Sequence, residues 1–534
     1  MDTATTRKKR VLKDAVDRII EEGEGEREGG RWSVIVQVPP DERTTHRLVS
    51  TAADVLRRRN VSLTARDLLP VSQEALEDLN SVAGGDHITD RAQQVLTAGD
   101  TSLAVKLGFE ASALADNLQP QSDNRALDQL LQNPIVHKAL SETTERKVSE
   151  QAVPLTREER QPTLTSSRSV VLNIEKDDLA RLPAETPQIQ GVFPNRTLRL
   201  PPLTEVKNVP DKVQEEKTSS WGVHRVGALA VWGAYNVRGR GTRIAVLDTG
   251  VEANHPDLAG KVTSWAEFDA DGYQVSDALS DAHDSDKHGT HCAGTIAGGR
   301  ASGSWIGVAP EAELAVGLVL KGGSGTDAQI LAGLDWAIRN RVDVISMSLG
   351  GLSLEVEPPS PYTETLIKAV VSGIPVVTAI GNEGGQTTGS PGNDWFAFSV
   401  GATDHADRAA GFSGGRTHVI RRSQYFRPDV LPLVYSKPEV SAPGVAIRSS
   451  VPNGDWAAFN GTSMATPHAA GAIALLLSAT TIGSRVPPEQ RALLIQDLLT
   501  GSVEELGESG QDHRYGFGRI DALRAIGFAK DRGY

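Results

Sequence analysis

The sequence predicts an α/β protein. A doubly wound, mostly parallel sheet in the C-terminal part follows a smaller α+β domain that carries a helical insertion. Short β-branched runs such as "TRIAVLDTG" and "VDVISMSLG" recur after Trp221, and each ends at Gly, Ser or Asp. Helix-length segments such as "DAQILAGLDWAIRNR" separate several of them, which is typical of βαβ units and a buried parallel sheet. Before Trp221, a strand and a strand–helix–strand pattern flank a long polar, helix-prone stretch.

Composition excludes several classes of protein. A chain of 534 residues exceeds one ordinary core, and its net charge of -13 argues against general nucleic-acid binding. No uncharged apolar run approaches the ~20 residues of a membrane span, and the charged N-terminus lacks the apolar core of a secretory signal. With Cys292 as the single cysteine, no intrachain disulfide forms. We therefore expect a cytoplasmic protein, with secretion by an unrecognised route as the alternative.

The N-terminal part is divided as follows. Residues 1–31 are charged and end in Gly/Glu repeats, and we expect a mobile tail. Residues 32–205 form the smaller domain, with a strand in "RWSVIVQVPP", a helix over about 41–58, a helical insertion over roughly 60–165, and a strand over Val170–Ile174. A short helix and an extended pair ending in prolines follow. The polar, proline-marked residues 206–220 suit a linker.

Residues 221–534 form the larger domain. Its predicted strands lie in the runs "TRIAVLDTG", "AELAVGLVL", "VDVISMSLG", "IPVVTAIGNEG" and "FAFSVGA". In open α/β sheets ligands bind beyond the carboxyl ends of the strands, which is where these runs place their polar residues.

One serine stands at the entrance of an apolar helix in "NGTSMATPHAAGAIALLLS". If Ser463 is the N-cap, Pro467 falls in the first turn, where the helix tolerates proline. Serine is a preferred N-cap, so capping alone explains Ser463 unless partner residues accompany it.

Three other polar residues occupy comparable positions. Asp248 ends an apolar strand, His288 opens a small-residue helix in "DSDKHGTHCAGTIAG", and Asn382 follows a buried strand in "VVTAIGNEGG". Each has an ordinary alternative: Asp248 as a turn former, Asn382 as a left-handed turn residue, and His288 with His291 as a metal pair. Together they supply a nucleophile, a base, a carboxylate to orient it, and an oxyanion donor.

The four segments resemble the active-site signatures of the subtilisin-like serine proteases, or subtilases. "VLDTG", "HGTHCAG", "GNEG" and "GTSMATPHAAG" occur in the family's order, and the resemblance runs from about Trp221 to the C-terminus. It implies a serine endopeptidase in which Asp248 orients His288, His288 is the general base, and Ser463 is the nucleophile. Asn382 and the Ser463 backbone N–H would bind the oxyanion. Activity should fall as His288 is protonated below about pH 6–7.

The resemblance also implies a substrate-binding surface. "SMSLGG" and "GGSGT" match the two strands that grip an extended peptide, and Glu383 matches a rim position that we expect to admit basic or polar residues. The residues so identified are Ser348, Leu349, Gly350, Gly325, Thr378, Ala379, Gly381 and Glu383.

Two segments depart from the family pattern. "GGRASGSWIGVAP" lacks the asparagine-rich form of the family's calcium loop, so Asp257 in "HPDL" is weak support for a structural calcium. "AEFDADG" is interpreted as a solvated turn, with calcium as the alternative, and no cofactor is expected for catalysis. The second departure is an insertion over residues 415–436, which is either a partner-docking element or a surface excursion.

The N-terminal domain resembles in pattern the ferredoxin-like pro-domains of subtilases. The resemblance implies a zymogen whose own N-terminal region inhibits it until the chain is cut between about Val206 and Ser220. Two alternatives stay open. One is a catalytically silent relative in which the N-terminal region permanently fills the cleft. The other is an esterase or acyl transferase that uses the same site.

Overall fold

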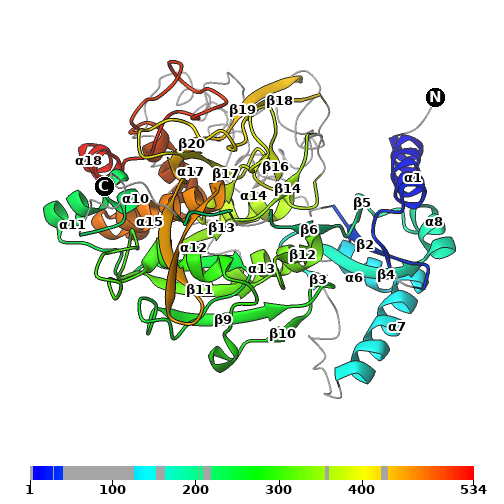
Figure 1. The fold of residues 1–534 in the computed structure, drawn as a ribbon. Helices are drawn as coiled ribbons and strands as arrows, with labels where there is room; N and C mark the ends of the chain where they lie inside the picture. The colour runs from blue at the N-terminus through cyan, green and yellow to red at the C-terminus, as the bar shows by residue number, and fades with distance from the viewer. Residues whose placement is uncertain are drawn as a thin grey trace.

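The structure is a computed structural model that describes residues 4–27, 29–39, 125–151, 163–201, 204–207, 218–354, 360–421 and 431–534. A large C-terminal domain lies beside a smaller N-terminal domain (Figure 1). The predicted helix over 41–58 and most of the helical insertion lie outside the described residues. The α/β fold class predicted from the strand–helix alternation is confirmed.

The N-terminal domain is an antiparallel sheet covered by helices. Strand β2 lies between β4 and β5, and β3 pairs with the far edge of β4. Among the described residues, helices α6 and α7 lie between β2 and β3 in the chain, and α8 lies between β4 and β5, which matches the βαββαβ order of a ferredoxin-like domain. The elements are β1 (Glu26–Arg27), β2 (Arg31–Gln37), β3 (Thr163–Leu164), β4 (Ser169–Glu175), β5 (Gly191–Pro194), α1 (Ala4–Glu22), α6 (Arg125–Leu131), α7 (Pro134–Gln151) and α8 (Lys176–Glu185).

The expectation of a mobile tail over residues 1–31 is wrong. Most of this stretch is helix α1, which buries Leu12, Val16 and Ile19 in the core of the N-terminal domain. These residues recur at intervals of four and three, so they line one face of the helix. The surrounding charges concealed that apolar stripe in the composition.

The C-terminal domain is built on an eight-stranded sheet in the order β10-β9-β11-β8-β13-β15-β17-β20. Every neighbouring pair is parallel except β10 and β9 at one edge. The strands are β8 (Arg243–Asp248), β9 (Val262–Phe268), β10 (Gln274–Ser276), β11 (Glu313–Leu318), β13 (Val344–Met347), β15 (Val376–Ala379), β17 (Phe398–Thr403) and β20 (Val440–Pro443).

Helices cover both faces of this sheet. Along β8, Ile244 and Val246 belong to the cluster that includes α12 and α15, whereas Ala245 and Leu247 belong to the cluster that includes α13 and α14. A strand buried on both faces is apolar throughout, as the sequence of β8 is. The helices are α10 (Trp221–Arg225), α11 (Ala228–Tyr235), α12 (His288–Ala297), α13 (Asp327–Arg339), α14 (Thr363–Val371), α15 (Thr462–Ala479), α16 (Ile482–Arg485), α17 (Pro488–Thr500) and α18 (Ala522–Asp531), with a 3₁₀ turn, η2, at Leu279–Asp281.

Further strands of this domain, among the residues that the structure describes, belong to small separate sheets. They are β12 (Ser324–Thr326), β14 (Gly351–Leu352), β16 (Gly389–Ser390), β18 (Arg416–Ile420), β19 (Leu433–Lys437), β21 (Ile447–Val451) and β22 (Asp455–Asn460).

The segment that follows the N-terminal domain pairs with two of these strands. Strand β6 (Thr197–Arg199) is antiparallel to β12, and β7 (Thr204–Glu205) is antiparallel to β22. The expected extended pair is therefore split between the domains, because β5 pairs with β2 whereas β6 joins the C-terminal domain.

Candidate active site

Asp248 and His288 lie in contact at the carboxyl edge of the sheet. Asp248 is the last residue of β8 and His288 is the first of α12, and Nδ1 of His288 lies 2.7 Å from Oδ1 of Asp248. Burial lowers the pKa of His288, but the Asp248 carboxylate and Cys292 outweigh it and raise the pKa well above 6.5. Donation from Nδ1–H to the carboxylate leaves Nε2 of the neutral ring as the basic nitrogen.

Ser463 is not the helix N-cap. Helix α15 begins at Thr462 with Gly461 as its N-cap, so Pro467 lies in the second turn. Because Pro467 has no N–H, the carbonyl four residues earlier, that of Ser463, receives no helical hydrogen bond from it. The Ser348 hydroxyl donates to this carbonyl at 2.8 Å and the Cys292 thiol at 3.5 Å. Two side chains from neighbouring elements thus hold the residue proposed as nucleophile.

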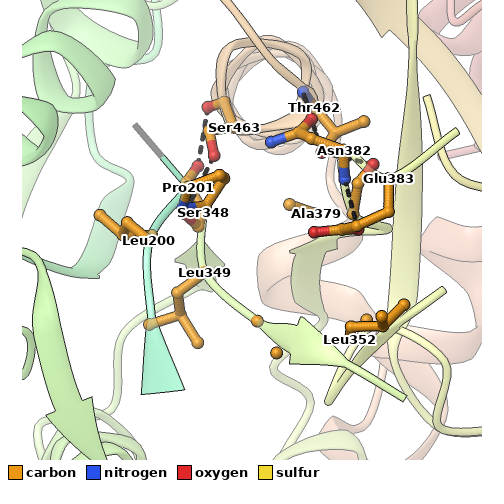
Figure 2. Close-up of a pocket in the computed structure, with 14 residues that line it drawn as sticks. Leu200, Pro201, Ser348, Leu349, Leu352, Ala379, Asn382, Glu383, Thr462 and Ser463 are labelled. Carbon is orange, nitrogen blue, oxygen red and sulfur yellow. Dashed lines mark hydrogen bonds between the residues drawn. The ribbon is translucent and has the colours of Figure 1, made fainter. Parts of the chain in front are cut away.

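The Ser463 hydroxyl donates to the carbonyl oxygen of Ser348 at 3.1 Å. Within the described residues no hydrogen bond joins it to His288. Leu200 and Pro201 lie beside these two serines (Figure 2). Proline has no backbone N–H, so Pro201 cannot donate to the Ser348 carbonyl, and that acceptor remains available to Ser463.

Asn382 is oriented by the first residue of α15. Its Oδ1 accepts from the backbone N–H of Thr462 at 2.8 Å and from the Thr462 hydroxyl at 2.9 Å. Figure 2 shows the amide nitrogen on the side that faces Ser463. An amide donor held in this way can stabilise negative charge that develops beside Ser463.

A pocket beside Ser463 contains most of the predicted substrate-binding residues. Gly325 lies outside the lining, in β12, where it is paired with Leu198; Thr378 lies buried in β15. The lining residues are Leu200, Pro201, Ser348, Leu349, Gly350, Gly351, Leu352, Ala379, Gly381, Asn382, Glu383, Gly389, Thr462 and Ser463.

Sequence reasoning missed the part of this pocket that comes from residues 197–201, which we call the cleft segment. Leu200 N–H donates to the carbonyl of Gly323 at 2.8 Å, which extends the pairing of β6 with β12. On the opposite wall, a Cβ at Gly351 would come within 2.4 Å of Leu198, so glycine permits this close approach. The alternating "TLRLPP" was the signal in the sequence, but nothing local indicated which domain it would pair with.

The two other histidines near the site are bound to backbone carbonyls. His291 Nε2 lies 2.9 Å from the Ile447 oxygen, and His468 Nδ1 lies 2.7 Å from the Met464 oxygen. Burial lowers their pKa values to about 3 and about 4, so both rings are neutral at neutral pH. Among the described residues, the side chains close enough to His288 to share a metal ion with it are Asp248 and Cys292, and His291 does not belong to that group. Cys292 is completely buried, and burial raises the pKa of its thiol.

The carboxylate that matches the family's calcium position is held by N–H donors. Oδ1 of Asp257 accepts from the Ala301 N–H at 2.6 Å, and Oδ2 accepts from the Trp456 indole at 2.7 Å. Each oxygen of this carboxylate thus already accepts one hydrogen bond from an N–H group. In "AEFDADG", Oδ1 of Asp269 accepts the backbone N–H groups of Asp271 and Tyr273, which is the geometry of a turn.

Comparison with known proteins identifies the larger domain. The model of the subtilase family matches residues 239–518, more than half of the chain. The chain is 40% identical over 284 residues to the intracellular serine protease of Paenibacillus polymyxa, an alignment that covers 52% of this chain and 78% of that protein. It is 36% identical over 311 residues to subtilisin of Bacillus pumilus, covering 57% of this chain and 98% of that protein.

A third relative, the major intracellular serine protease of Bacillus subtilis, is 34% identical over 285 residues, covering 51% of this chain and 81% of that protein. No helix in the described ranges is long and apolar enough to cross a membrane. The chain belongs to the subtilase family and is a serine endopeptidase.

Proposed function

We propose that the chain hydrolyses peptide bonds through an Asp248–His288–Ser463 triad and an acyl-enzyme. The observation that carries the proposal is the 2.7 Å Asp248–His288 hydrogen bond at the same edge of the sheet as Ser463 and its pocket. His288 Nε2 takes the Ser463 proton as Oγ attacks the substrate carbonyl, and then gives that proton to the leaving amine. Water, activated by the same nitrogen, releases the acid. Asn382 and the Ser463 N–H bind the oxyanion in both steps.

The substrate is an extended polypeptide. A substrate strand would lie between β12 and residues 348–350 and bind through its main chain, which accepts many sequences. Glu383 lies at the rim, and its Oε2 accepts the Asn382 backbone N–H at 2.9 Å. We expect its charge to favour lysine and arginine before the scissile bond. Glu383→Gln should reduce that preference in a peptide library; an unchanged profile would remove Glu383 from the specificity determinants.

The chain is made as a zymogen whose N-terminal domain inhibits the site. The cleft segment supports this, because it occupies the place of a substrate strand and Pro201 lies in the pocket beside Ser463. The Ser463–Ser348 hydrogen bond also directs the nucleophile's proton away from His288. The chain continues past the site to pair with β22, so maturation requires a cut, which we place between about Val206 and Ser220.

Intact mass against time, for the wild type and Ser463→Ala, tests both proposals. Loss of roughly the first 200 residues by the wild type alone would assign Ser463 as nucleophile and the N-terminal domain as a removable inhibitor. A fluorophosphonate probe should label the matured wild type and not the variant. If neither chain is cut and neither is labelled, the N-terminal region fills the cleft permanently and the chain acts as a binding protein. Labelling with cleavage of esters but not of peptides would indicate an esterase.

Two further proposals follow from the site and from the relatives. Catalysis needs no cofactor, and Asp257 acts as a hydrogen-bond acceptor that joins Ala301 to Trp456 rather than as a calcium ligand, a proposal supported by the N–H donor at each of its oxygens. The chain acts in the cytoplasm, as the names of two relatives suggest for those proteins. Fractionation of the native cell, with the secreted fraction as the alternative, tests the location.

A further inference from the structure

The insertion over residues 415–436 forms a hairpin in its described part, and this hairpin packs beside the substrate pocket. Strands β18 and β19 pair antiparallel, with His418 opposite Tyr435 and the two ring centroids 5.4 Å apart. The hairpin lies near β14 and β16 (Figure 1). Two backbone hydrogen bonds tie its base to the neighbouring loop, from Gly415 N–H to the Thr387 oxygen at 2.8 Å and from Gln386 N–H to the Gly415 oxygen at 2.8 Å.

His418 reaches from this hairpin to Thr388. Its side chain is buried, and Nε2 lies 3.1 Å from Thr388 Oγ1. The single hydroxyl proton of Thr388 is donated to the Ser353 carbonyl at 3.0 Å, so the imidazole has to donate in the contact with Oγ1. This assigns the hydrogen of the ring to Nε2. Burial, with the charges of Lys437 and Arg416, lowers the pKa of His418 to about 4, which keeps the ring neutral.

Thr388 in turn supports one wall of the pocket. Its carbonyl accepts the Ser353 N–H at 2.9 Å. The adjacent residues Leu352 and Gly389 are partners in the antiparallel pairing of β14 with β16. Gly351, Leu352 and Gly389 of that pairing line the pocket. The contacts therefore run from His418, through the Thr388 hydroxyl, to the wall of the pocket.

We propose that His418 is a positioning residue for substrate binding: its Nε2–H fixes Thr388, and through Thr388 the β14–β16 wall. The inserted hairpin thus stabilises one wall of the pocket. This inference rests on the proposed role of that pocket in binding substrate. It predicts that loss of the donor loosens the grip on substrate and leaves the chemistry at Ser463 largely unchanged.

The test compares His418→Ala, His418→Gln and Thr417→Ala in full-length chains allowed to mature to constant mass. Active-site concentration is set by fluorophosphonate titration, and KM and kcat are measured on a peptide substrate. We expect His418→Ala to raise KM by about three- to tenfold with kcat within about twofold, the size of one lost hydrogen bond. Glutamine, whose amide N–H reaches a similar position, should recover much of the loss.

Thr417→Ala is the matched control. Thr417 is adjacent to His418 but exposed, and its hydroxyl is paired across the hairpin with Ser436 at 2.9 Å, so its loss should leave KM unchanged. Thr388→Val removes the acceptor for His418 together with the hydroxyl that donates to Ser353, so it should raise KM at least as much as His418→Ala does. This variant is used if the alanine variant fails to fold.

Three results would overturn the inference. The first is an unchanged KM in titrated His418→Ala, or in Thr388→Val if the alanine variant does not fold. The second is an increase in KM that His418→Gln shows to the same extent as His418→Ala. The third is an equal increase in KM in Thr417→Ala. Failure of the proposed function is distinguishable, because the wild type would then show no labelling and no turnover to compare.

Discussion

At the scale of single residues, the proposed mechanism makes the protonation of His288 set the pH range of activity. A general base has to be neutral, so under this proposal the rate rises with pH through the pKa of His288. Burial alone would lower that pKa, and the carboxylate 2.7 Å away reverses the shift. The sequence alone led to the expectation that activity falls below about pH 6–7, because it assumed the pKa of an ordinary histidine.

We expect kcat/KM to reach half its maximum above pH 6.5. In Asp248→Asn the lowering effect of burial prevails, so the half-maximum should move below pH 6.5, while kcat falls by about 10⁴-fold, the loss known for serine-protease triads. A pH–rate profile of both proteins on one peptide measures this. An identical midpoint in the two would show that Asp248 does not control the base.

The proposed oxyanion role of Asn382 belongs to the same scale, because it depends on one oriented amide donor. Asn382→Leu should lower kcat by about 10²–10³-fold, the loss already known for the equivalent donor of subtilisin, with KM little changed. The reason is that negative charge forms on the substrate oxygen in the transition state only. Steady-state kinetics of titrated enzyme would detect it. A rise in KM at constant kcat would instead make Asn382 a substrate-binding residue.

At the scale of elements, the start of α15 sets the contacts of Ser463, and strand β6 occupies the edge of β12 beside the pocket. Pro467 removes one helical donor, and Ser348 and Cys292 compensate at the carbonyl of Ser463. Strand β6 adds itself to β12 and carries Leu198 against Gly351. The same pairing that would bind a substrate therefore binds the chain itself.

Leu198→Glu should weaken that pairing, because it places a charge against the apolar wall at Gly351. The matched control is Thr197→Glu, one residue earlier on the same strand with its side chain exposed. Initial rates on a short peptide, before any cleavage of the N-terminal domain, should rise several-fold in the first variant only. Equal rates in both variants and the wild type would mean that β6 does not limit access.

At the scale of the whole molecule, buried polar contacts join the two domains. Arg168 of the N-terminal domain pairs with Glu364 of α14 at 2.5 Å, with side chains 10% and 1% exposed. Thr165 and Ser166 donate to Asp335 of α13. Arg168 thus brings a cation to Glu364 across the interface, whereas Asp335 also pairs with Arg339 of its own helix at 3.7 Å.

Arg168→Met should destabilise the full-length Ser463→Ala chain by about 3 kcal/mol, because it breaks a buried ion pair by removing the Arg168 cation from beside Glu364. Arg181→Met removes an exposed pair within α8 and should cost less than about 1 kcal/mol. Denaturant unfolding of the three chains gives the comparison. Similar losses in both variants would show that the interface pair is solvated.

Calcium should have little effect on the stability of the molecule. Calcium at a thousand times the dissociation constant of a site would add about 4 kcal/mol to the free energy of unfolding. We expect no such gain, because N–H donors already bind both oxygens of Asp257. We expect the thermal midpoint of the Ser463→Ala chain to be the same in EDTA and in millimolar calcium, and Trp456→Phe to lower it. A midpoint that rises strongly with calcium would contradict this account of Asp257.

Local sequence patterns were sufficient to predict the fold class, the order of the strands along the chain, and the four segments that bear Asp248, His288, Asn382 and Ser463. These are local properties, because a strand buried on both faces is apolar along its length and a site at strand ends concentrates polar residues there. The helix in residues 4–22 was equally local, but its charges hid the apolar stripe.

The partners of these residues could be identified only once the chain was seen folded. The pairing of β6 with β12, the contact of His418 with Thr388, and the donors to Asp257 join positions from 30 to nearly 200 residues apart. No local pattern encodes such a pairing, because strands and polar side chains present the same groups to every partner. The shift in the pKa of His288 likewise depends on burial and on a carboxylate 40 residues away.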